Sequence, residues 1–113
     1  MELPANEADI LIYRELCKKS FRSFVQIAFH QVEPAREFLN NWHIDAICEH
    51  LEDVTKGDIN RLVINVPPGS MKSLLACVFW PAWVLTNKPY TKWIYGSYAL
   101  GISKRDNLRM RRL

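Results

Sequence analysis

A lysine and a serine that follow a short loop are the residues of this chain best suited to chemistry. Lys72 and Ser73 come directly after Pro67-Pro68-Gly69-Ser70-Met71. Main-chain N–H groups in such a loop, and at the start of a following helix, favour an anion at one point. The lysine adds a positive charge for the terminal phosphates of a nucleotide, and the adjacent hydroxyl can bind Mg²⁺. The stretch therefore predicts a phosphate-binding loop.

The loop departs from the common phosphate-binding pattern, G-x-x-x-x-G-K-[ST]. Met71 stands at the position of the second glycine, and Val66 stands at the position of the first. The pattern alone is equally compatible with an ordinary turn that carries an exposed lysine between a strand and a helix.

The segments on either side of the loop are apolar and predict the elements that position it. The strand predicted over residues 61–66 has a mostly β-branched apolar run, Leu62, Val63, Ile64 and Val66, which is typical of a strand buried on both faces of a parallel sheet. Residues 72–85 favour a buried helix that Pro81 bends or interrupts. Residues 92–98 favour a second strand, so the chain is predicted to be α/β with a right-handed βαβ unit. The end of that strand, Ser97-Tyr98, is then expected near the loop.

Helical periodicity predicts four further helices. They span residues 7–19, 21–32, 42–55 and 99–113. Asn6 is suited to cap the first of these helices, and Gly57 is placed to end the third. We expect residues 1–60 to be a helical lead-in and residues 61–113 to be the phosphate-loop portion of one domain, incomplete as given.

Three segments carry a resemblance to a known family. Residues 66–75 and 78–83, together with the upstream residues 42–51, resemble the large terminase subunits of tailed bacteriophages and prophages. These proteins are the motors that pump DNA into empty capsids. The resemblance extends over about residues 21–113. It implies a P-loop NTPase-type core, with ATP and Mg²⁺ as cofactors, and it identifies the chain as the N-terminal part of the ATPase domain.

The resemblance also implies a role for each residue of the site. The phosphates would lie in a cradle made by the main chain of Pro68, Gly69, Ser70 and Met71. Lys72, the catalytic residue, would neutralise the β- and γ-phosphates, and Ser73 would reach Mg²⁺. Trp42 and His43 would stack on and hydrogen-bond to adenine. The alternative is that Trp42 is a core aromatic and that His43 only begins a helix.

The two halves of the chain carry opposite charge. Residues 1–60 hold six Lys/Arg and eleven Asp/Glu, whereas residues 61–113 hold nine Lys/Arg and a single acid, Asp106. The basic half suits phosphates, although a solvated face would look the same. The resemblance implies double-stranded DNA, a small terminase subunit and a portal protein as partners, in the cytoplasm of a bacterial host. No apolar run is long enough to span a membrane.

Two other functions stay open. A helicase-like P-loop ATPase would use the same loop, and a non-catalytic α/β module could bind DNA or a protein through the basic C-terminal face. A hydrolase also needs an acid at a strand end to hold Mg²⁺, and only Asp106 follows Lys72. We therefore expect a truncated motor that binds ATP weakly and does not turn it over.

Overall fold

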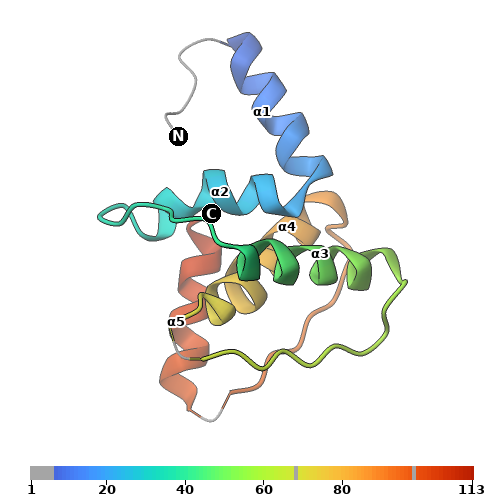
Figure 1. Cartoon of the computed structure of the whole chain (residues 1–113), viewed down its shortest axis with the longest axis vertical. Helices are drawn as coiled ribbons and strands as arrows, with labels where there is room; N and C mark the ends of the chain where they lie inside the picture. Colours follow the sequence, from blue (N-terminus) through green and yellow to red (C-terminus); the bar gives the residue numbers. More distant parts are fainter. Residues whose placement is uncertain (1–6, 68, 98) are drawn as a thin grey trace.

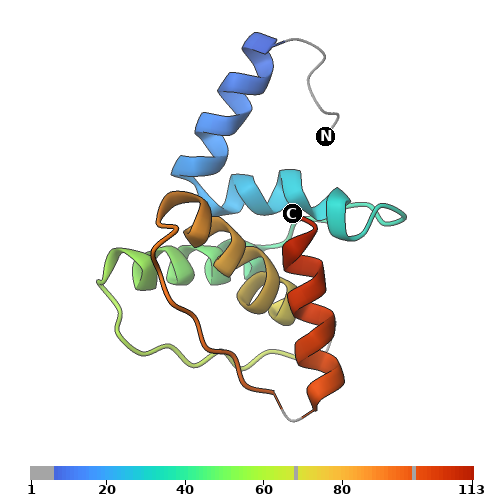
Figure 2. The same cartoon turned by 180° about the vertical axis from the view of Figure 1, so that it is seen from behind.

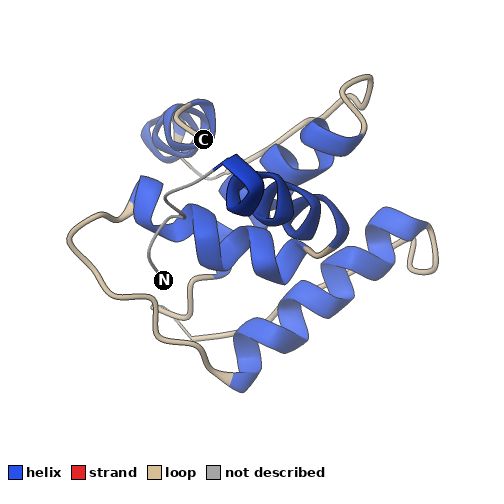
Figure 3. Ribbon diagram, turned by 90° about the horizontal axis from the view of Figure 1, so that it is seen from above, coloured by secondary structure: helices blue, strands red, loops and turns tan. Residues whose placement is uncertain are grey.

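The computed structural model describes residues 7–67, 69–97 and 99–113, and in these residues all regular structure is helical (Figure 3). The helices are α1 (Glu7–Lys19), α2 (Phe21–Val32), α3 (Trp42–Lys56), the π-helix η1 (Leu74–Phe79), α4 (Trp80–Asn87) and α5 (Leu100–Arg111). η1 and α4 belong to one helical run that begins at Lys72. Figures 1 and 2 show this run in the middle of the molecule, with α1 extending away from the other helices.

The predicted α/β fold is wrong for the described residues, because neither predicted strand forms. Residues 61–67 and 92–97 are extended, but no main-chain hydrogen bond joins either segment to another part of the described chain. β-Branched and aromatic residues suit a pleated, half-buried surface, yet they do not supply the neighbouring strand that a ladder requires. Leu62 and Ile64 pack against the helical core, whereas Val63 between them is 80% exposed.

The predicted helices form close to their predicted bounds. α2 and α3 bury residues at helical spacing: Phe21, Val25, Ala28 and Phe29 in α2, and Ile44, Ile47, Cys48 and Leu51 in α3. α1 also forms, but it buries none of its residues, so Ile10 and Leu16 of its apolar stripe remain exposed. Asn6, its predicted cap, lies outside the described residues.

Gly57 ends α3, as its position predicts. Its φ is +88°, a left-handed conformation that glycine adopts readily because it has no Cβ. Its N–H donates to the carbonyl O of Val54 at 3.1 Å, and the N–H of Asp58 donates to that of Asp53 at 3.0 Å. These two bonds form a Schellman motif, which closes α3 before the chain continues into residues 61–67.

One hydrophobic core joins the two halves of the chain. Its fully enclosed side chains come from α2, α3 and η1, and include Phe21, Val25, Ile44, Cys48, Leu75, Val78 and Phe79. Phe24 packs edge-on against Phe79, with ring centroids 6.4 Å apart. Trp83 of α4 meets Phe21 at 5.3 Å. Because burial of such rings dominates the stability of a small domain, the core fixes the start of the helical run, and with it the loop, against α2 and α3.

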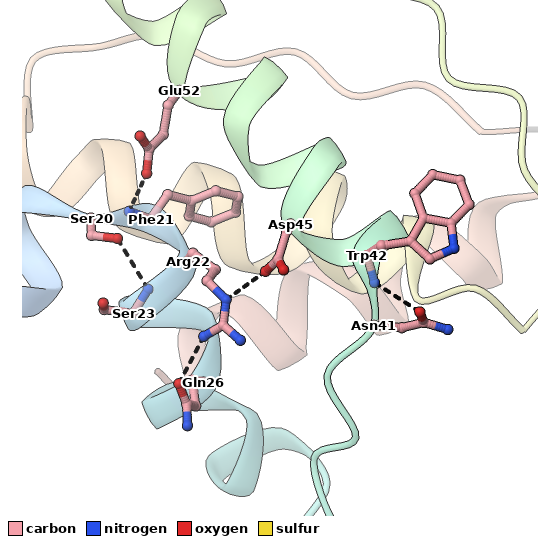
Figure 4. Close-up of polar contacts among 9 residues, drawn as sticks. All are labelled: Ser20, Phe21, Arg22, Ser23, Gln26, Asn41, Trp42, Asp45 and Glu52. Atoms are coloured by element: carbon pink, nitrogen blue, oxygen red, sulfur yellow. Dashed lines mark hydrogen bonds and ion pairs between the residues drawn. The ribbon is translucent and has the colours of Figure 1, made fainter.

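Polar contacts hold α2 against α3 beside the core (Figure 4). Arg22 Nε donates to Asp45 Oδ1 at 2.6 Å, and its Nη1 donates to Gln26 Oε1 at 2.8 Å. The main-chain N–H of Phe21 donates to Glu52 Oε1 at 2.7 Å, so a carboxylate of α3 satisfies the first turn of α2. Because Asp45 and Glu52 lie about two turns apart on α3, these charge-assisted bonds restrict rotation between the two helices.

Pro81 explains the π-helical turn. Proline has no N–H, so it cannot close a helical hydrogen bond to the preceding turn. The N–H of Trp80 bonds to the carbonyl of Leu75, five residues back, which leaves the carbonyl of Ala76 facing Pro81 without a donor. The hydroxyl of Tyr95 donates to Ala76 O at 2.9 Å and fills this gap, and its burial there raises the pKa of Tyr95. The predicted interruption is therefore a change of helical register.

Replacing Gly101 with alanine is expected to raise the free energy of unfolding by about 0.5–1 kcal/mol. Gly101 lies in the first turn of α5, has no positive φ, and a Cβ there would meet no atom within 4 Å. Alanine restricts the unfolded chain more than glycine does. Gly57→Ala is the opposite control, because its φ of +88° strains any residue with a Cβ. Thermal unfolding should shift in opposite directions in the two variants, and a shift in the same direction would contradict the argument.

Candidate functional site

The predicted phosphate loop curls because the sign of φ alternates along it. Gly69 has a φ of +84° and Met71 a φ of +63°, while Ser70 between them has no positive φ. Successive residues that alternate in this way direct their N–H groups to one side and form an anion-binding concavity. The helical run starts at Lys72, so its N-terminal dipole adjoins the concavity. This main-chain geometry favours a bound anion.

Met71 shows how the loop forms without the second glycine of the common pattern. A non-glycine residue with positive φ costs on the order of 1–3 kcal/mol, a cost that glycine avoids. The side chain of Met71 is half-buried against the hydrophobic core. Its carbonyl O accepts the N–H of Leu75 at 2.9 Å, the first hydrogen bond of the helical run. Packing on one side and helix formation on the other hold the strained backbone in place.

Two hydrogen bonds brace the loop. The hydroxyl of Ser70 donates to the carbonyl O of Pro67 at 2.6 Å, and Nε2 of His43 donates to the carbonyl O of Ser70 at 3.2 Å. His43 lies in the first turn of α3, so the second bond ties α3 directly to the loop. Nothing in the sequence indicated this contact, because it joins residues 27 positions apart. Pro68, predicted to belong to the cradle, lies outside the described residues.

A cavity of about 420 Å³ adjoins the loop and is lined by residues 66, 67 and 69–74. Lys72 and Ser73 both line it, and both are exposed. Within the described part of the chain, the Lys72 ammonium has no ion-pair partner and the Ser73 hydroxyl makes no capping hydrogen bond. A free ammonium and a free hydroxyl at an anion-binding concavity fit the terminal phosphates and the Mg²⁺ of a nucleotide.

Trp42 is not a core residue, so that alternative is wrong. It is 76% exposed at the start of α3, where Asn41 Oδ1 accepts its main-chain N–H at 2.8 Å (Figure 4). Its ring meets that of His43 nearly at right angles, with centroids 6.4 Å apart. The two residues predicted to bind adenine therefore share one helix end, His43 in contact with the loop and Trp42 available to a planar ligand.

Ser97 and Tyr98, at the end of the second predicted strand, were expected near the loop. Ser97 does not line the loop cavity, and its hydroxyl lies 2.7 Å from that of Ser103 in α5 and donates to the carbonyl O of Ala99 at 2.8 Å. Tyr98 lies outside the described residues. The prediction relied on a parallel sheet, which would have brought the ends of both strands to one edge.

The three cysteines are free thiols with no activating environment. Burial raises the pKa of Cys48 to about 12. Burial also raises the pKa of Cys17 and of Cys77; for Cys77, the Asp106 carboxylate raises it further and Lys72 partly offsets the increase. Because the thiolate is the reactive form, these thiols are unsuited to nucleophilic chemistry at neutral pH.

α5 presents the predicted basic face. Its exposed cations, with those just after it, are Lys104, Arg105, Arg111 and Arg112. Arg109 instead pairs with Glu33 at 3.5 Å, between α5 and the end of α2. Asp106 is only 8% exposed, and Arg105 Nε lies 3.3 Å from its Oδ1. A row of exposed cations on one helix suits the phosphates of a nucleic-acid backbone.

The loop has an exposed lysine, Lys72, and a carbonyl, that of Ser70, held by His43, which is the chemistry expected of a site for a polyanionic ligand.

None of the described helices is both long and apolar enough to cross a bilayer. Comparisons with known protein families, with curated proteins and with solved structures find no match to this chain.

Proposed function

We propose that residues 66–74 bind the phosphates of ATP with its Mg²⁺, and that the chain is the ATP-binding N-terminal part of the large terminase subunit of a phage or prophage. The observation that carries the proposal is the alternation of φ at Gly69, Ser70 and Met71, which gathers main-chain N–H groups on one side. The resemblance of residues 42–51, 66–75 and 78–83 supplies the family. The helical fold gives no support to the family. The phosphate-binding part of the proposal rests on the loop.

Each residue of the site has a distinct role in this proposal. The N–H groups of the loop contact the phosphates, the ammonium of Lys72 lies at the β- and γ-phosphates, and the hydroxyl of Ser73 contacts Mg²⁺. Trp42 stacks on adenine, while His43 fixes the carbonyl of Ser70 so that the loop keeps its curl. In the assembled motor the partners are double-stranded DNA, the small terminase subunit and the portal protein, in the cytoplasm of the bacterial host.

Binding without turnover is the activity expected of these residues. No carboxylate is among the described residues that line the loop cavity, and Asp106 lines a different cavity. Hydrolysis of a nucleoside triphosphate requires an acid near Mg²⁺ and a group that orients the attacking water. Steady release of phosphate that disappears in Lys72→Ala would contradict this part of the proposal. A helicase-like ATPase would share the loop and is the nearest alternative.

A non-catalytic role in binding DNA or a protein is a second candidate, favoured by the four exposed cations at the C-terminal end. Such binding would weaken steeply with salt, because each phosphate contact releases condensed counterions. It would not respond to ATP. A salt-dependent affinity for DNA in a chain that fails to bind ATP·Mg²⁺ would select this function over the first.

Gly69→Ala tests the carrying observation directly. A Cβ at Gly69 would meet no atom within 4 Å, so the substitution acts through the backbone alone, at a φ of +84°. The left-handed conformation costs alanine about 1–2 kcal/mol, and the affinity for ATP·Mg²⁺, measured by calorimetry, should fall by up to about thirtyfold.

Gly96→Ala is the matched control, because a Cβ at Gly96 would also meet no atom within 4 Å, but Gly96 has no positive φ. It should bind ATP·Mg²⁺ as the unaltered protein does. Equal affinities in the two variants, or no binding by the unaltered protein, would reject the proposed phosphate site.

A further inference from the structure

A second cavity, of about 320 Å³, shares no lining residue with the loop cavity. Its walls come from η1, α4, α5 and the extended segment that precedes α5. Pro81, Leu85 and Met110 make it largely apolar, which is usual for a pocket that encloses a small molecule. Its volume is at the lower end of the range for such pockets.

The cavity contains an acid that is poorly compensated. Asp106 is 8% exposed, and its ion-pair partner among the described residues is Arg105, whose Nε lies 3.3 Å from Asp106 Oδ1. The side chain of Arg105 is itself 52% exposed, so solvent weakens this pair. An enclosed carboxylate is stabilised by a cation or by several hydrogen-bond donors close to it. The acid therefore favours a positively charged occupant.

The aromatic wall of the same cavity also favours a cation. The rings of Trp93 and Tyr95 are parallel within 2°, with centroids 5.9 Å apart, and Trp80 packs edge-on against Trp93 at 4.9 Å. Aromatic faces attract ammonium and guanidinium groups. Nε1 of Trp93 is enclosed and has no hydrogen-bond acceptor among the described residues. Because that nitrogen exposes almost no surface, a ligand in the cavity would contact the rings of this wall and not the indole N–H.

We propose that this cavity binds a small organic cation with an apolar body. The cation lies at the Asp106 carboxylate, and the apolar body packs on Trp93, Tyr95 and Leu85. An anion is excluded by the carboxylate. The proposal does not depend on nucleotide binding at the loop.

Three ligands of one shape test the charge requirement. Phenylalaninamide, at a pH where its amine is protonated, carries the cation and an amide oxygen. 3-Phenylpropanamide lacks the ammonium, and 3-phenylpropionate carries a negative charge instead. The readout is the NMR resonance of the Trp93 indole N–H, assigned by its loss in Trp93→Phe. Saturable shifts are expected with phenylalaninamide only, and equal shifts with the neutral amide would overturn the proposal.

Asp106→Asn tests the carboxylate while keeping its shape. The affinity for phenylalaninamide should fall by about tenfold or more, as expected for loss of a charged hydrogen-bond partner. Asp58→Asn removes an exposed acid that does not line the cavity and should leave the affinity unchanged. Equal affinities in the two variants would reject the site.

A second route keeps the test decisive if Asp106→Asn fails to fold. Ser103→Leu adds volume to the cavity wall at a helical position and should also abolish binding, whereas Lys56→Ala, at an exposed cation that does not line the cavity, should not affect it. N-acetyl-lysine amide distinguishes the source of the cation. Tighter binding of this compound than of phenylalaninamide identifies a lysine side chain of a protein, and the reverse identifies a free amine. Failure of every cation to bind would overturn the proposal.

Discussion

Leu75→Ala is expected to lower the free energy of unfolding by about 3–5 kcal/mol, as truncation of a fully buried leucine does. Leu75 is fully buried in the core, in the first turn after the loop, and its N–H bonds to Met71 O at 2.9 Å. Truncation removes three buried carbon groups, Cγ and the two Cδ methyls, and leaves a space that the surrounding helices fill only in part. Small domains have a total stability of about 5–15 kcal/mol, so the midpoint of urea unfolding should fall sharply.

Leu39→Ala is the matched control, since it makes the same chemical change at a residue that is 72% exposed. Its effect should stay within about 0.5 kcal/mol. Equal shifts of the urea midpoint in the two variants would mean that the helical run after the loop does not pack against α2 and α3 as described.

The sequence predicted the helices well because each has local signals. Spacing of apolar residues at three and four positions reports which face packs inward, and it placed the buried residues of α2 and α3 correctly. The end of α3 was predictable from Gly57 because a left-handed backbone at this one residue is enough to end the helix. Pro81 is also a local signal, because it changes the hydrogen-bond register of the helical run in which it lies. Even here, periodicity overestimated burial in α1, because an apolar stripe does not show whether another element covers it.

The sheet could not be predicted in the same way, because a strand depends on a partner. Residues 61–67 and 92–97 have the composition of strands and are extended, yet no ladder forms within the described residues. Ile94 is 98% exposed although it lies in the middle of a predicted strand. Composition reports that a segment suits a pleated surface, whereas pairing is a long-range property of the fold.

The candidate site was predictable where it is contiguous. Lys72 and Ser73 were found from their neighbours, and the positive φ of Met71 explains why glycine is usual at that position. The contact of His43 with Ser70 O and the enclosure of Asp106 were not predictable, because both join elements distant in the sequence. The one signal for Asp106 was its isolation as the single acid among nine basic residues after position 60.

Lys72→Ala should lower the affinity for ATP·Mg²⁺ by about ten- to a hundredfold, the largest effect on binding expected from the proposed function. The ammonium is exposed at the loop cavity and has no ion pair within the described residues, so its removal breaks no contact that stabilises the fold. The loss should appear as a difference between ligands. Binding of ATP weakens most, binding of ADP weakens less, and binding of adenosine is unchanged because it carries no phosphate.

Lys88→Ala is the control for charge, because Lys88 is an exposed cation at the opposite end of the same helical run. Both variants lower the net charge by one, so an effect of the overall field would be the same in each and would decrease with added salt. An effect of direct contact belongs to Lys72 alone and to ligands with phosphates alone. Equal losses in the two variants, or a loss for adenosine as large as that for ATP, would mean that the loop does not hold a nucleotide by its phosphates.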